Sequence, residues 1–204
     1  MSQEEEAGGL MAGFRAASGG VTARFAAAQA GIIRNLVSQV AELVGGDSPV
    51  GQDAEPDGQQ DAGPLAGTAA ALDAQFGLSD STEAPDDPAL ARLLPDAYRD
   101  DPKAAAEFRR YTEQGLRSGK VAAARTVLAT LPPRGGRIRL SEPQGQAWLR
   151  ALNDVRLALS VRLGVTEDFD ADVADMGSDD PRYAYVWVYQ WLAYLQESLV
   201  EALG

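Results

Sequence analysis

YAYVWVYQWLAYL, the stretch from Tyr183 to Leu195, runs for thirteen residues without a charge. Its aliphatic residues recur every three or four positions, which is the repeat of one face of an α-helix. They are Val188, Leu192, Leu195 and, just beyond the stretch, Leu199. We expect this face to lie in the core.

An adjacent face of the same helix carries Trp187, Trp191 and Tyr194. A helix that is apolar on two faces either lies at the centre of a core or shares one face with a partner. Because Trp and Tyr are enriched in protein-binding hot spots, the second face is a candidate surface for a protein partner or a homodimer. We expect Trp187 in the core, and Trp191 and Tyr194 in a partly exposed contact.

Helix starts are marked clearly through the second half of the chain. Asp-Asp-Pro occurs at residues 86–88, 100–102 and 179–181, and Asp as N-cap followed by Pro in the first turn favours a helix start. The triplets predict helices from Pro88 to about Leu94, from Pro102 to about Leu131, and from Pro181 to about Ala202. Ser141 and Gln144 form a capping-box pattern that opens a fourth helix, ending at Leu163 before Gly164.

Short strands and one more helix complete the predicted elements. Residues 14–25 form two strands around the turn Ser18-Gly19-Gly20, and residues 26–44 form an amphipathic helix that ends at Gly45-Gly46. A third strand follows Gly135-Gly136, and it can pair with the first two in one small sheet. The predicted fold class is mainly α with a minor α+β part: about four to five helices, a small β-hairpin or short antiparallel sheet, and a disordered acidic linker.

The distribution of charge predicts the domain organisation. Residues 35–91 hold eleven acids and no Lys or Arg, and a segment so polar and so rich in Gly and Pro cannot offset its ordering entropy by burial. We expect residues 1–12 to be a disordered N-terminus and residues 45–87 to be an acidic flexible linker. Residues 13–44 and 88–204 then form a single domain.

Composition excludes several kinds of chemistry. The 204 residues carry a net charge of −12 and contain neither Cys nor His, which excludes disulfides, thiol nucleophiles, a Ser-His-Asp triad and His or Cys metal ligands. The acidic start, Met1 to Glu6, is unlike a signal peptide, and no run of apolar residues is long enough to span a membrane. We therefore expect a soluble, cytoplasmic protein that is not an enzyme and holds no metal or cofactor. The only candidate for a catalytic base is the cluster Asn153, Asp154 and Arg156.

The middle of the chain is basic, in contrast to the rest. Residues 92–162 hold fourteen bases against seven acids. Acids are interspersed and no helix-turn-helix is predicted, so direct nucleic-acid binding is not expected. Pairing with the chain's own acidic linker and C-terminal loop is favoured. The candidate partner-binding residues are Trp191, Tyr194, Arg137, Arg139, Arg150, Asn153, Asp154 and Arg156.

Three segments together resemble one family. They are Leu93-Leu-Pro-Asp-Ala-Tyr-Arg-Asp-Asp-Pro102, Leu152-Asn-Asp-Val-Arg-Leu-Ala-Leu159 continuing to Val165, and Tyr194-Leu-Gln-Glu-Ser-Leu-Val200. They are similar to the actinobacterial AosR family, formerly a domain of unknown function and often encoded beside the ClpS adaptor. The resemblance covers residues 13–44 and 88–203.

The resemblance implies a non-enzymatic regulator that contacts the transcription machinery, such as a sigma factor or RNA polymerase. The alternative is an accessory factor for ClpS-linked proteolysis, with Clp components as partners. Redox sensing in the family implies a cysteine pair, and this chain has none. A disulfide within the 204 residues therefore cannot be its switch.

Overall fold

The computed structural model describes residues 13–45, 87–95, 102–166 and 182–204, with single residues between 169 and 180; for residues 102–111 it describes only the backbone. The predicted disordered N-terminus and nearly all of the predicted acidic linker lie outside this part of the chain, so both stay predictions. Within it, three strands and five helices follow one another. The predicted mainly helical fold with a small antiparallel sheet is confirmed.

The sheet joins two distant parts of the chain. Strands β1 (Arg15–Ala17) and β2 (Gly20–Phe25) form the predicted hairpin, and β2 also pairs antiparallel with β3 (Gly136–Ser141). Gly20 has a φ of 148°, and a Cβ there would lie 2.0 Å from the carbonyl oxygen of Leu140. Only glycine therefore allows β2 and β3 to approach at this point.

Helix α2 (Ala27–Gly45) follows β2 directly. The side chain of Gln29 accepts a hydrogen bond from the backbone N–H of Ala26 at 2.8 Å, which satisfies one free donor at the helix start. At the other end, the helix finishes at Gly45, the first residue of the predicted Gly45-Gly46 end, and Gly46 lies outside the described residues. The guanidinium of Arg117 donates to the carbonyl of Val44 at 2.5 Å. A cation on a neighbouring helix thus satisfies the C-terminus of α2.

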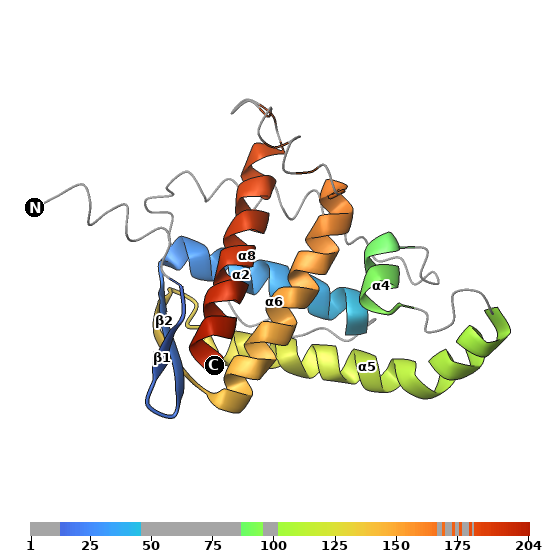
Figure 1. The fold of residues 1–204 in the computed structure, drawn as a ribbon, viewed down its shortest axis with the longest axis horizontal. Coiled ribbons are helices and arrows are strands. Elements are labelled where there is room, and N and C mark those ends of the chain that lie inside the picture. Colours follow the sequence, from blue (N-terminus) through green and yellow to red (C-terminus); the bar gives the residue numbers. More distant parts are fainter. Residues whose placement is uncertain are drawn as a thin grey trace, which may run out of the picture.

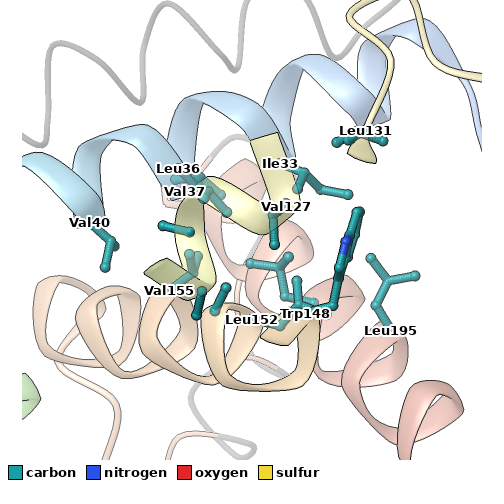
Figure 2. Close-up of a cluster of buried hydrophobic side chains, with 14 of the residues drawn as sticks. Ile33, Leu36, Val37, Val40, Val127, Leu131, Trp148, Leu152, Val155 and Leu195 are labelled. Atoms are coloured by element: carbon teal, nitrogen blue, oxygen red, sulfur yellow. The ribbon is translucent and has the colours of Figure 1, made fainter. Parts of the chain in front are cut away.

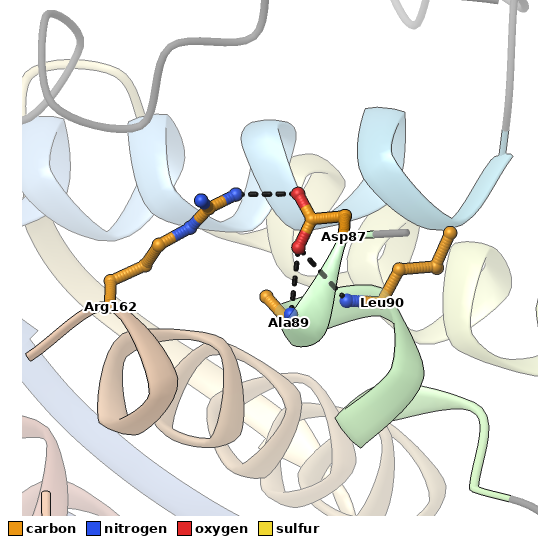
Figure 3. A network of polar contacts seen from close by, with 4 residues as sticks. All are labelled: Asp87, Ala89, Leu90 and Arg162. Atoms are coloured by element: carbon orange, nitrogen blue, oxygen red, sulfur yellow. Dashed lines mark hydrogen bonds and ion pairs between the residues drawn. The ribbon is translucent and has the colours of Figure 1, made fainter. Parts of the chain in front are cut away.

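Short helix α4 (Pro88–Leu93) begins at the first Asp-Asp-Pro triplet, as predicted. One oxygen of Asp87 accepts hydrogen bonds from the backbone N–H groups of Ala89 and Leu90, at 2.7 and 3.4 Å. Its other oxygen lies 2.6 Å from the guanidinium of Arg162 in α6 (Figure 3). The N-cap therefore also fastens α4 to the body of the molecule.

The remaining helices are α5 (Pro102–Thr130), α6 (Glu142–Leu163) and α8 (Tyr183–Leu203). The capping box of Ser141 and Gln144 is present, and Gly164 closes α6 in the left-handed conformation, with a φ of 64°. Helix α8 begins two residues later than predicted. Asp180 accepts a hydrogen bond from the backbone N–H of Arg182 at 2.8 Å, so this Asp stabilises a turn before the helix and is not its N-cap.

The helices pack around one continuous core (Figure 1). Helices α6 and α8 lie side by side and cross α2 and α5, while the sheet lies near the start of α2 and α4 near its end. Figure 2 shows apolar side chains of α2, α5, α6 and α8 gathered around Trp148. That indole is fully buried, and its Nε1–H donates to the hydroxyl of Thr130 at 2.8 Å. The aliphatic face predicted for α8 is buried as expected.

Candidate protein-interaction site

The structure reverses the expectation for Trp191. The side chain is 2% exposed and belongs to the core, whereas a partly exposed contact was predicted. The reason is helical geometry: Trp191 follows Val188 by three residues and precedes Leu195 by four, so it lies on the aliphatic face itself. Trp187, expected in the core, is only partly buried.

An accessible row of aromatic side chains does exist on α8, and it differs from the predicted one in having Tyr183 in place of Trp191. Tyr183 is 47% exposed, Trp187 is partly buried and Tyr194 is 39% exposed. Their spacing of four and seven residues places them on one side of the helix. We call Tyr183, Trp187 and Tyr194 the outer aromatic stripe. Sequence reasoning missed Tyr183; its spacing to Trp187 and Tyr194 was a signal, but the sequence does not show which apolar side of α8 faces the core.

Two members of the outer aromatic stripe, Trp187 and Tyr194, pack against other parts of the molecule. The rings of Trp187 and Trp191 are stacked, with centroids 6.0 Å apart and planes at 15°, so a buried residue supports an accessible one. Nearby, Ser198 accepts a hydrogen bond at 3.0 Å from the backbone N–H of Phe14, which fastens the start of the hairpin to α8. Tyr194 lies beside this junction, since a Cβ on Gly13 would be 3.2 Å from its ring.

Asn153 and Arg156 belong to the seam between α6 and α8. Arg156 donates to the side-chain oxygen of Gln196 at 2.6 Å, and Gln196 donates to that of Asn153 at 3.5 Å. The guanidinium of Arg156 also lies 5.3 Å from the ring centroid of Tyr189, at cation–π distance. These contacts hold two helices together.

Asp154 faces the other way, toward α5. It is 4% exposed, and one carboxylate oxygen lies 2.6 Å from the ammonium of Lys120. Burial raises the pKa of Asp154 above its ordinary value, and the hydrogen bond and charge of Lys120 and the charge of Arg150 only partly oppose this. The candidate base cluster is thus divided, because Asp154 and Arg156 point to different neighbouring helices.

Arg137 and Arg139 lie on the exposed side of β3, alternating with the buried Ile138 and Leu140. The strand register adds two arginines that sequence reasoning did not single out. Arg24 of β2 lies opposite Arg137. Arg15 of β1 lies opposite Thr22 of β2, which in turn lies opposite Arg139. We call Arg15, Arg24, Arg137 and Arg139 the arginine face. Arg150 is exposed on α6 and not on the sheet, and its charge acts on Asp154.

Among the described residues, no group of three or more acidic side chains is arranged to hold a metal ion. None of the helices there is long and apolar enough to cross a membrane. The predicted residues are not brought together in one site: Tyr194 lies in the outer aromatic stripe, Trp191 in the core, Asn153, Asp154 and Arg156 at the contacts of α6 with α8 and α5, Arg150 on the exposed side of α6, and Arg137 and Arg139 in the arginine face.

Comparison with known proteins gives a family match over nearly the whole sequence. Residues 11–203 match the family described as "Domain of unknown function (DUF2017)". The protein named "Oxidative stress regulator AosR" in Mycobacterium tuberculosis (strain ATCC 25618 / H37Rv) is 40% identical over 132 residues, which cover 58% of this chain and 59% of that protein. A relative in Mycobacterium leprae (strain TN) is 39% identical over 136 residues, or 60% of this chain and 61% of the relative. The chain thus spans about three fifths of the curated relatives it matches, and no solved structure matches it.

Proposed function

Because this chain belongs to the family described as DUF2017, and proteins named oxidative stress regulator AosR are 40% identical to it over 132 residues, we propose that it is a regulator. It acts by contact with another protein and not by catalytic turnover. The identity to named regulators is the observation that carries this proposal. The partner is a component of the transcription machinery, namely a sigma factor or RNA polymerase.

The outer aromatic stripe is the surface through which the contact is made. Exposed Tyr and Trp supply a large contact area at low entropic cost and are the residues most enriched in binding hot spots. Tyr183 and Tyr194 are among the few large hydrophobic side chains that are exposed in the described part of the chain. Trp187 is held in place by its stacking on Trp191, so the stripe loses little freedom when it binds.

The test is recovery of partners from the host organism with an affinity-tagged full-length chain, quantified by mass spectrometry. The test variant is the double substitution Tyr183→Ala and Tyr194→Ala. Leu116→Ala is the matched control, because Leu116 is 47% exposed but lies on α5. We expect the wild type and the control to recover a sigma factor or RNA polymerase. The double variant should bind that partner about thirtyfold more weakly, as the loss of ~2 kcal/mol at a hot spot implies.

Two results would contradict the proposal. If the double variant recovers the transcription machinery as well as the wild type does, the outer aromatic stripe is not the contact. If Clp subunits are recovered instead of a sigma factor or RNA polymerase, the protein is an accessory factor for proteolysis.

A further inference from the structure

The arginine face concentrates like charge without compensation among the described residues. Arg24 and Arg137 are directly opposite each other on antiparallel strands, and Arg139 lies two residues from Arg137 on the same side. Like charges directly opposite each other on neighbouring strands destabilise a sheet. None of the ion pairs between described residues involves an arginine of this face. A negatively charged occupant would remove this repulsion.

The chain itself carries an acidic segment of matching charge. Residues 46–86 hold nine acids and no Lys or Arg. Within them, Asp53, Glu55 and Asp57 alternate along the sequence, so in an extended chain their carboxylates would repeat every ~6.8 Å on one side. Arg137 and Arg139 alternate in β3 with the same repeat. Guanidinium groups bind carboxylates in paired, charge-assisted hydrogen bonds.

The segment is long enough to reach the face. It leaves the described structure at Gly45, at the end of α2, and α2 with its 19 residues is ~28 Å long. The sheet lies at the beginning of that helix (Figure 1). Asp57 and Asp61 come 12 and 16 residues after Gly45, so they can lie up to ~40 and ~53 Å from it.

We propose that the acidic segment of residues 46–86 docks on the arginine face and occupies it when no partner is present. The contact is intramolecular, so the segment acts at a high effective concentration and any external anion must displace it. Nucleic acid is the weaker candidate for this face, because a chain with a net charge of −12 repels a polyanion. The arginine face is therefore a self-covered binding surface, distinct from the outer aromatic stripe.

The absence of cysteine allows a direct experiment on the full-length chain. A nitroxide spin label is attached at Gln59→Cys, and the backbone amide signals are recorded by NMR with the label oxidised and reduced. We expect the amides of Thr22, Arg24, Arg137 and Arg139 to lose most of their intensity in the oxidised sample. The signals should recover in ~1 M salt, where the Debye length is only about 3 Å.

Two double variants separate docking from net charge. Arg137→Gln with Arg139→Gln should abolish the broadening, whereas Arg92→Gln with Arg125→Gln should keep it. Arg92 and Arg125 are exposed on α4 and α5 and supply the same loss of charge away from the sheet.

Three outcomes would overturn the proposal. The first is no broadening, or broadening spread evenly over the surface. The second is an equal loss of broadening in both double variants. The third is binding of a DNA duplex by the full-length wild type that is lost in the Arg137 and Arg139 variant, which would make the face a nucleic-acid site. None of these results bears on the outer aromatic stripe, so this proposal can fail separately from the proposed function.

Discussion

Asp154 shows how burial and pairing compete at a single carboxylate. Its pKa is raised because burial outweighs the hydrogen bond and charge of Lys120. At pH values between the ordinary pKa of 3.8 and the higher folded one, the folded chain holds a proton that the unfolded chain has released. The stability contributed by Asp154 is therefore fully present below pH 3.8 and is lost as the pH rises through the folded pKa.

The prediction is a difference in the free energy of unfolding between the wild type and Asp154→Asn that falls as the pH rises. Denaturant unfolding at a series of pH values from ~3 to ~7 measures this difference. Asp180→Asn is the control with the opposite sign, because hydrogen bonds from Arg182 lower the pKa of Asp180. If the Asp154 difference grows with pH, attraction to Lys120 outweighs burial.

Trp191 and Tyr194 are three residues apart in sequence and have opposite roles. Trp191 is 2% exposed and Tyr194 is 39% exposed. We expect Trp191→Ala to cost ~3–5 kcal/mol of unfolding free energy and Leu195→Ala ~2–5 kcal/mol, because both create cavities in the core. Tyr194→Ala should cost less than ~1 kcal/mol. Urea unfolding of the three variants measures these values, and a Trp191 variant as stable as the wild type would place that ring outside the core.

At the level of elements, the sequence predicted most helix ends correctly because capping is local. The N-cap of α4 and the capping box and glycine cap of α6 depend on residues within four positions of each other. The sequence pattern does not reveal contacts from elsewhere in the chain that complete a helix end. Arg117 of α5 satisfies the end of α2, and no pattern within residues 26–46 indicates that.

Two substitutions of Asp87 can separate the contribution of the N-cap of α4 from that of the ion pair with Arg162. Asp87→Ala should lower the free energy of unfolding by ~0.5–2 kcal/mol through loss of the cap. Asp87→Asn keeps an N-cap side chain but loses the charge, so it should cost only ~0–1 kcal/mol, as expected for a partly exposed pair. Unfolding in low and in high salt distinguishes the contribution of the cap from that of the ion pair, since salt screens only the ion pair. Equal costs for both variants would mean that the contact with Arg162, and not the cap, fixes α4.

Across the whole molecule, the family and the fold class were predictable, and the resemblance to the AosR family is confirmed. The candidate surfaces were only partly predictable. The arginine face combines β1 and β2 with β3, more than a hundred residues later, and only the strand register brings Arg24 opposite Arg137. The members of the outer aromatic stripe could be predicted only by knowing which side of α8 faces the core, because both sides are apolar.

The absence of cysteine makes a prediction about the whole chain. Peroxide can oxidise only methionine among its sulfur-containing side chains, and these are Met1, Met11 and Met176. We therefore expect far-UV circular dichroism and oligomeric state to stay unchanged over the minutes in which thiol switches respond, with only slow sulfoxide formation. Circular dichroism, size-exclusion chromatography and mass spectrometry after peroxide, with and without dithiothreitol, measure this. A fast change reversed by dithiothreitol would contradict it, since the chain has no thiol to form a disulfide. If the protein takes part in a response to oxidant, a disulfide formed within these 204 residues cannot be the switch.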